Sequence, residues 1–296
     1  MMTNDLLALM WAPFLMCLVL TGIHAYLGIH VIAREVVFVD IALAQIAALG
    51  AAIAILFGMD AHGGETYAVS LSFTFLGALI FATVKSRKQR IPQEAIIGIT
   101  YAVASAAAIL AMSKAVGETE HLKDMLVGNI LVVSWPEVGR AALLCAFVGA
   151  FHYIFRRKFL LISTNPQAAE AQGISVGWWD FLFYVSFGFV VSSAVAIAGV
   201  LLVFCYLIVP SVGAMLYADT IGRRLAIGWT MGTVVSGLGV YLSLLLDLPT
   251  GAAIVCTFGA VLLLMAAARV VFFRRPAVRP SEAPAPPGHR ASQDSH

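Results

Sequence analysis

The stretch VFVDIALAQIAALG, from Val37 to Gly50, is a run of aliphatic and small residues that contains one carboxylate, Asp40, and one amide, Gln45. The apolar run continues to about residue 58, and about 20 mainly apolar residues are enough for a helix to cross a membrane. Its Ala and Gly residues allow close helix–helix contact in lipid. The stretch therefore predicts one helix of a multi-helix membrane bundle, in which a carboxylate at membrane depth needs a functional explanation.

The composition of the whole chain agrees with a membrane protein. Of the 296 residues, 61% are hydrophobic and 11% are charged, whereas soluble domains carry roughly 25% charged residues. The formal net charge is only +2, so no basic surface large enough to bind nucleic acid is expected. The four cysteines lie in apolar runs without a CxxC or Cys/His spacing, which indicates neither a zinc knuckle nor a disulfide framework.

Nine apolar segments predict an all-α, polytopic membrane bundle over residues 1–275. The sixth and seventh segments are separated only by Ile197 and Ala198. The sequence is therefore compatible with nine transmembrane helices, or with eight full spans and one short, bent or re-entrant segment. Residues 276–296 are rich in Pro, Ala and Ser, which predicts a disordered cytoplasmic tail. The nine segments lie at about residues 9–32, 37–58, 67–84, 94–113, 138–155, 179–196, 199–218, 225–246 and 251–273.

Basic residues indicate the orientation of the bundle, because Lys and Arg concentrate in short cytoplasmic loops. If the N-terminus is outside, nine spans place five basic positions on the cytoplasmic side, which predicts an N-out, C-in topology. These positions are Arg34, the run KSRKQR from Lys85 to Arg90, the run from Arg156 to Lys158, Arg223 with Arg224, and Arg274 with Arg275.

A polar segment, TNPQAAEAQGI from Thr164, interrupts the spans on the predicted cytoplasmic side. Asn165 is a candidate N-cap, Pro166 occupies the first helical position, and Gly173 ends the pattern. The segment therefore predicts a short capped helix at about residues 165–174. On these local signals it is either a docking element or a simple amphipathic connector.

The order of several motifs resembles the membrane subunit of ABC-type zinc, manganese and iron importers. NPQAAEAQGI resembles the cytoplasmic coupling segment of that family, and the opening stretch corresponds to its second span. LVGNILVVS, from Leu126 to Ser134, resembles the outer-face segment before its fifth span. The runs AIAGVLLVFCYLIVPSVGAMLYA and LSLLLDLPTGAAIV resemble later spans, so that the likeness extends from about Gly22 to Leu264.

The resemblance implies a permease domain with a type II ABC importer fold, located in the bacterial inner membrane. It also implies a homodimer with the path between two copies, a separate cytoplasmic ABC ATPase, and a periplasmic metal-binding protein. The cargo would be a divalent metal ion, with no bound cofactor. The chain has no GxxxxGK[ST] loop, so ATP hydrolysis is assigned to the partner and not to this chain. The implied ATPase-coupling residues are Asn165, Pro166, Glu170, Gln172 and Gly173.

The metal ligands of the family match this sequence only in part. The family's second span carries an aspartate followed four residues later by a histidine, which share one helix face. Here Ala44 occupies the fourth position after Asp40, and the next residue, Gln45, lies about 140° around the helix from Asp40. The usual ligand pair is therefore incomplete.

Two histidines in the first span offer a replacement for the missing ligand. Counting outward from the turn near Arg34, His30 lies at about the depth of Asp40, and His24 at about that of Gln45. We expect Asp40 with His30 or His24 to contact the metal, with Gln45 as a weaker oxygen ligand. Alternatively, the histidines hydrogen-bond neighbouring helices and Asp40 caps the second span.

Two further acidic residues lie at predicted span ends. Asp180 is expected to be an interfacial cap, and Glu94 is expected to complement a helix dipole. The competing function is a stand-alone secondary transporter or channel for an ion or small solute. Such a protein needs a buried charge relay, and charges in the middle of the spans are sparse.

Overall fold

The computed structural model of the chain describes residues 2–60, 63–84, 92–113 and 130–272, and these residues form helices without any strand. The predicted all-α class is therefore confirmed. The predicted tail at 276–296 and much of the segment LVGNILVVS lie outside the described residues. The helices are α1 (Met2–Ala33), α2 (Val39–Leu56), α3 (Gly64–Val84), α4 (Gln93–Met112), η1 (Ile130–Val132), α6 (Trp135–Ile154), α7 (Arg156–Thr164), α8 (Pro166–Ala171), α9 (Val176–Ala198), α10 (Val200–Met215), α11 (Ile221–Leu246) and α12 (Thr250–Phe272).

Eight of the described helices are long and apolar enough to cross a membrane, and α10 is a shorter ninth apolar helix. The 16 residues of α10 extend about 24 Å at 1.5 Å per residue, which is less than the roughly 30 Å of a hydrocarbon core. The predicted break between the sixth and seventh segments was misplaced, because Ile197 and Ala198 both belong to α9. The break is at Gly199, whose φ of 79° is a conformation that glycine adopts readily and other residues do not.

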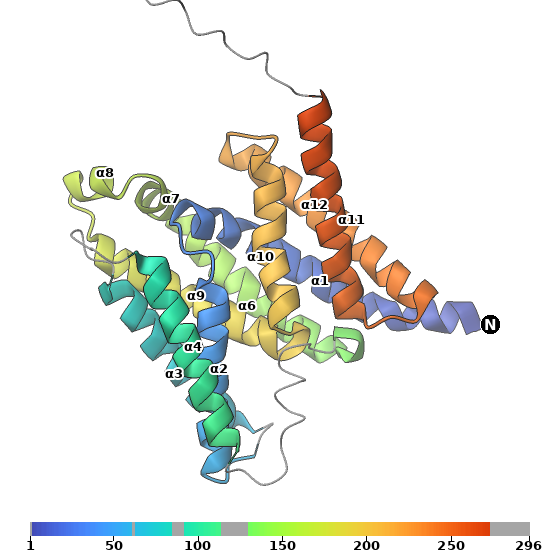
Figure 1. Cartoon of the computed structure of the whole chain (residues 1–296), viewed down its shortest axis with the longest axis horizontal. Helices are drawn as coiled ribbons and strands as arrows, with labels where there is room; N and C mark the ends of the chain where they lie inside the picture. The colour runs from blue at the N-terminus through green and yellow to red at the C-terminus, as the bar shows by residue number, and fades with distance from the viewer. Residues whose placement is uncertain (1, 61–62, 85–91, 114–129, 273–296) are drawn as a thin grey trace, which may run out of the picture.

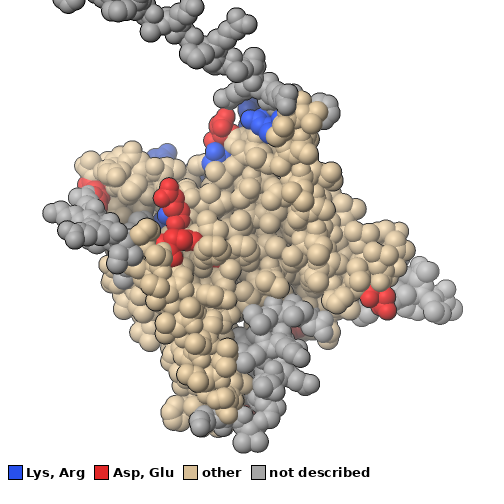
Figure 2. All heavy atoms as spheres, in the orientation of Figure 1, with Lys and Arg blue, Asp and Glu red and all other residues tan. Residues whose placement is uncertain are grey.

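The helices form two packed groups that meet where α10 contacts α9 and α2 (Figure 1). In one group, α2 packs against α3 and α4, and α3 packs against α9; in the other, α1 packs against α10 and α11, and α11 packs against α12. The helices α7 and α8, the α10–α11 connection and the end of α12 all lie at the upper side of Figure 1. Figure 2 shows Lys and Arg side chains near the same side, which is the side that the sequence predicts to face the cytoplasm.

The end of α1 is a tight, hydrogen-bonded turn. Val36 N donates to the Val31 carbonyl at 3.2 Å, and Glu35 N donates to that of Ile32 at 3.1 Å, which is a Schellman motif. Val31 and Val36 are both fully buried, as the apolar contact of this motif requires. Glu35 takes the left-handed position with a φ of 57°, so the backbone of the preceding Arg34 is fixed.

The packing of α1 against α10 depends on the absence of a side chain at Gly28. A Cβ atom at this position would lie 1.9 Å from the carbonyl oxygen of Leu207 and 2.4 Å from Ser211 Oγ. Ser211 Oγ donates to the carbonyls of Leu207 at 3.0 Å and Ala25 at 3.3 Å. The two helices therefore meet backbone to backbone, which is how small residues stabilise helix packing in lipid.

We predict that Gly28→Ala lowers the stability of the purified protein, because the added methyl must push α10 away from α1. Overpacking of this kind costs about 1–3 kcal/mol. Thermal unfolding in detergent measures the effect. Gly22→Ala in the same helix is the matched control, since a Cβ at Gly22 has no neighbour within 4 Å. Equal melting temperatures for the two variants would contradict the close contact.

Candidate functional site

The short helix α8 has the caps that its sequence predicts. Asn165 Oδ1 accepts a hydrogen bond from Ala168 N at 2.9 Å, and Pro166 occupies the first turn. Gly173 has a φ of 75°, and Ile174 N donates to the Ala169 carbonyl at 3.0 Å, so α8 also ends in a Schellman motif. Both predicted boundaries are confirmed.

One face of α8 is buried against the bundle and another is exposed. Ala169 is fully buried against the bundle, whereas Gln172 is exposed and Glu170 is half-buried. The helix contacts α7 and α9. The anchored alanine and the two capped ends hold α8 as a defined element whose exposed face is available to another protein.

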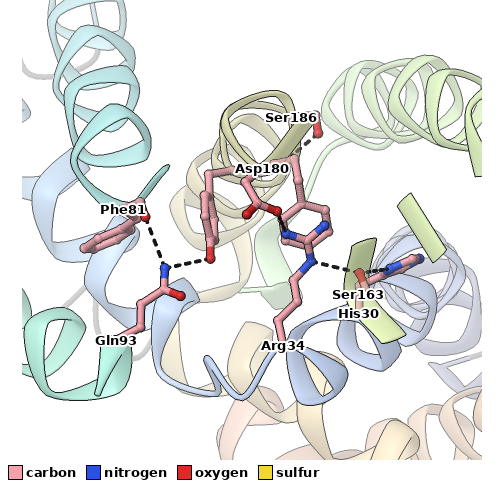
Figure 3. Close-up of polar contacts among 9 residues, drawn as sticks. His30, Arg34, Phe81, Gln93, Ser163, Asp180 and Ser186 are labelled. Atoms are coloured by element: carbon pink, nitrogen blue, oxygen red, sulfur yellow. Dashed lines mark hydrogen bonds and ion pairs between the residues drawn. The ribbon is translucent and has the colours of Figure 1, made fainter. Parts of the chain in front are cut away.

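A buried ion pair joins α1 to α9 next to this element (Figure 3). Arg34 Nη1 donates to Asp180 Oδ1, and both side chains are at most 1% exposed. The guanidinium carbon also lies 4.1 Å from the centre of the Phe183 ring. The prediction of an interfacial cap at Asp180 was wrong, and Arg34 is not a solvated loop residue, because each of these charges neutralises the other inside the protein.

Ser163 of α7 extends this network to the histidine of α1 (Figure 3). Its Oγ accepts a hydrogen bond from Arg34 Nε at 2.9 Å and shares one with His30 Nδ1, also at 2.9 Å. His30 is 1% exposed. Three helices, α1, α7 and α9, therefore meet in one polar cluster, which we call the Arg34 cluster: His30, Arg34, Ser163 and Asp180.

The other histidines of the spans also have partners within the bundle. His24 Nδ1 donates to the Leu20 carbonyl of its own helix at 2.9 Å. His152 Nε2 shares a hydrogen bond of 2.8 Å with Ser186 Oγ, and its ring stacks on that of Phe159. His30 thus bonds a neighbouring helix, as one of the two alternatives for it expects, whereas His24 does not.

The polar residues of α2 occupy two different faces. Asp40 is 2% exposed, and its Oδ1 atom is buried without a hydrogen-bond partner. Gln45 is only half-buried, as are Ile41 and Leu49, which lie four residues to either side of it. The structure therefore separates Asp40 from Gln45, in agreement with the geometry of the sequence, and leaves Gln45 on a face that this chain covers only in part.

Glu94 of α4 binds the start of α2. Its Oε1 atom accepts a hydrogen bond from Phe38 N, the residue that precedes the helix, at 3.1 Å. The carboxylate therefore acts at the N-terminus of a neighbouring helix, where the dipole favours negative charge. It fixes the first turn of α2, in which Asp40 lies.

The structure does not assemble the predicted metal contacts into one ligand set. No hydrogen bond or ion pair joins Asp40 to His24 or His30, and among the described residues no group of three His, Cys, Asp or Glu side chains could hold a metal ion. The roles of Asp40, His24, His30 and Gln45 as contacts of a passing ion stay predictions.

Sequence reasoning missed the partners within the Arg34 cluster. Arg34 follows the first span and Asp180 opens the sixth, so two opposite charges were predicted for the same side of the membrane, which is a signal for pairing. Ser163 carried no such signal, because a serine near the end of a basic segment is usually solvated.

Comparisons with known proteins agree with one another. A family model described as the ABC 3 transport family matches residues 7–269. The manganese transport system membrane protein MntC of Listeria innocua is 28% identical over 233 residues, which are 79% of this chain and 81% of the relative. The chelated iron transport system membrane protein YfeC of Yersinia pestis is 26% identical over 193 residues, 65% of each chain.

A solved structure shares the fold. The complex PsaBC from Streptococcus pneumoniae with a Fab contains a chain that superimposes with a TM-score of 0.73 at 23% identity. The similarity covers 87% of this chain and 90% of that chain. At this identity the comparison establishes the arrangement of helices alone.

We predict that Arg34→Gln strongly destabilises the protein, because it leaves the Asp180 carboxylate buried without its counter-ion. Breaking one side of a buried pair costs about 3–5 kcal/mol. The amount of folded protein in membranes and its melting temperature in detergent measure the loss. The matched control is Arg157→Gln, an exposed arginine of α7. A variant at Arg34 as stable as this control would show that the pair is dispensable.

Proposed function

The chain belongs to the ABC 3 transport family, and we propose that it is the membrane-spanning subunit of an ATP-driven importer for a divalent metal ion. In this proposal a separate cytoplasmic ATPase supplies the energy, a periplasmic metal-binding protein delivers the ion, and two copies of the chain form the path in the bacterial inner membrane. The observation that carries the proposal is α8, a short helix capped at both ends on the side with the basic residues.

The geometry of α8 supports its assignment as the ATPase contact. A contact that transmits force has to be rigid, and α8 is held by the Asn165 cap, by the Gly173 turn and by the buried Ala169. Its exposed face carries Gln172, with Glu170 beside it. The ATPase would therefore bind at Glu170 and Gln172, while Asn165, Pro166 and Gly173 maintain the helix.

The uncovered face of α2 supports a path between two copies. Gln45, Ile41 and Leu49 are only half-buried by this chain, so a second copy, or lipid, has to cover the rest of each side chain. A weak amide ligand suits transport, since a transport site has to release its ion. Asp40 and Gln45 would then contact the ion in turn.

The nature of the cargo follows from chemistry and from the relatives. Carboxylate and imidazole are ligands for manganese, iron and zinc alike. The name of the Listeria relative favours manganese and that of the Yersinia relative adds iron, while zinc enters the proposal through the resemblance of the sequence motifs. We propose manganese or zinc, to be decided by metal content.

We predict that Asp40→Asn abolishes metal accumulation without lowering the amount of protein. The amide has the shape of the carboxylate but no charge to attract a cation. Manganese, zinc and iron in cells that express the variant are measured together by mass spectrometry. Glu65→Gln, at an exposed carboxylate of α3, is the control. Accumulation equal to that of the control would make Asp40 a structural residue.

We predict that replacing Pro166–Gly173 with a Gly/Ser linker of equal length abolishes copurification of the ATPase. The single substitution Gln172→Arg should weaken copurification, because it places a bulky charge on the exposed face of α8. Asp219→Arg, at an exposed residue of the α10–α11 connection on the same side, is the matched control. Undiminished ATPase binding to the linker variant would refute the coupling role of α8.

A further inference from the structure

We propose that Ser163 is a positioning residue for transport, whose hydroxyl passes a movement of α8 to the end of α1 and so to α2. The proposal rests on the proposed function, in which an ATPase binds α8. It assigns a task to Arg34, Ser163 and Asp180, which neither the ATPase contact nor the path itself uses.

Ser163 lies where the two elements join. It is 5% exposed and stands two residues before Asn165, the N-cap of α8. Its Oγ atom is bonded at 2.9 Å to both His30 Nδ1 and Arg34 Nε. His30 lies in the last turn of α1, and Arg34 directly follows the helix. The hydroxyl of Ser163 therefore binds side chains at both ends of this last turn. A displacement of α8 that carries Asn165 with it also moves this hydroxyl.

Arg34 converts such a displacement into a movement of α1 because its head group is held at Nε, at Nη1 and on one face of the guanidinium. The guanidinium is planar with donors in fixed directions, and its Nη1 donor is bound by Asp180 of α9. The ring of Phe183 lies against its face. The group cannot follow Ser163 freely without losing the buried ion pair. If Ser163 is displaced with α8, the backbone at the end of α1 therefore has to move.

Backbone hydrogen bonds connect the end of α1 to the start of α2. Val36 N donates to the Val31 carbonyl and Val39 N donates to the Val36 carbonyl, each at 3.2 Å, and Val36 and Val39 are fully buried. Phe38 N is bound by Glu94 of α4. Asp40 follows in the first turn of α2. The turn from Arg34 to Asp40 therefore has no loose segment that would absorb a movement.

The neighbouring hydroxyl provides the contrast. Thr164 is exposed, and its Oγ1 donates to the Leu160 carbonyl at 2.8 Å, within α7 itself. It therefore touches the same helix end as Ser163 without linking α7 to α1. If the link between α7 and α1 matters for transport, removal of the Ser163 hydroxyl must impair transport, whereas removal of the adjacent Thr164 hydroxyl must not.

The test measures coupling and not only activity. The chain and the ATPase that copurifies with it are reconstituted in liposomes with the binding protein, and Mn²⁺ delivered per ATP hydrolysed is determined. Ser163→Ala should keep the assembly and its ATP hydrolysis but lower the ratio about fivefold or more, the scale of coupling between distant sites. Ser163→Thr, which keeps the hydroxyl, should restore the ratio, and Thr164→Ala should leave it unchanged.

The outcomes separate this proposal from the proposed function. If Ser163→Ala has the Mn²⁺ per ATP ratio of Thr164→Ala, the relay is overturned while the importer stands. If Ser163→Ala does not assemble although Ser163→Thr does, the hydroxyl has a structural role and the relay is likewise overturned. If the wild-type assembly moves Mn²⁺ without hydrolysing ATP, the proposed function fails first, and the relay fails with it.

Discussion

The ion pair between Arg34 and Asp180 is the interaction on which the end of the structure that carries α7 and α8 depends. Burying a charge costs several kcal/mol, and the partner restores this only if the geometry is good and the remaining donors are also satisfied. Here Ser163 and the Phe183 ring contact the guanidinium, but its Nη2 atom is buried without a hydrogen-bond partner among the described residues. The ends of α1, α7 and α9 must therefore meet at one place, and this meeting point sets the position of α8. The pair is better understood as a device that specifies an arrangement than as a large source of stability.

The turns that end α1 and α8 determine the rest of the structure around the Arg34 cluster. Both α1 and α8 end in Schellman motifs, with Glu35 and Gly173 in the left-handed position. The glycine adopts this conformation without strain, whereas the glutamate costs about 1–2 kcal/mol. The buried valines beside Glu35 and the Arg34 cluster offset this cost. The turn at Glu35 connects α1 to α2, and the turn at Gly173 connects α8 to α9. Each connection is only a few residues long, so the helices on either side are held closely together.

Features that depend on a local sequence pattern, such as spans and helix caps, could be predicted from the sequence. Contacts between residues far apart in the chain could not. Apolar runs located the spans, and the Asn165, Pro166 and Gly173 signals located α8, because caps act within a few residues. The angle between Asp40 and Gln45 was also predictable, since helix geometry determines it. The predicted break between α9 and α10 lay one to two residues before the observed break at Gly199, because hydropathy carries no information on backbone conformation. The pairing of Arg34 with Asp180 joins residues 146 positions apart, so no local signal revealed it.

The central claim is that this chain moves a metal ion only when a separate ATPase drives it. The most direct measurement is uptake of radiolabelled Mn²⁺ by liposomes that contain the chain alone, or the chain with its ATPase, each with and without ATP and the binding protein. The account predicts accumulation only when the ATPase, the binding protein and ATP are all present. Uptake by the chain alone, driven by an ion gradient, would contradict the account and identify a secondary transporter.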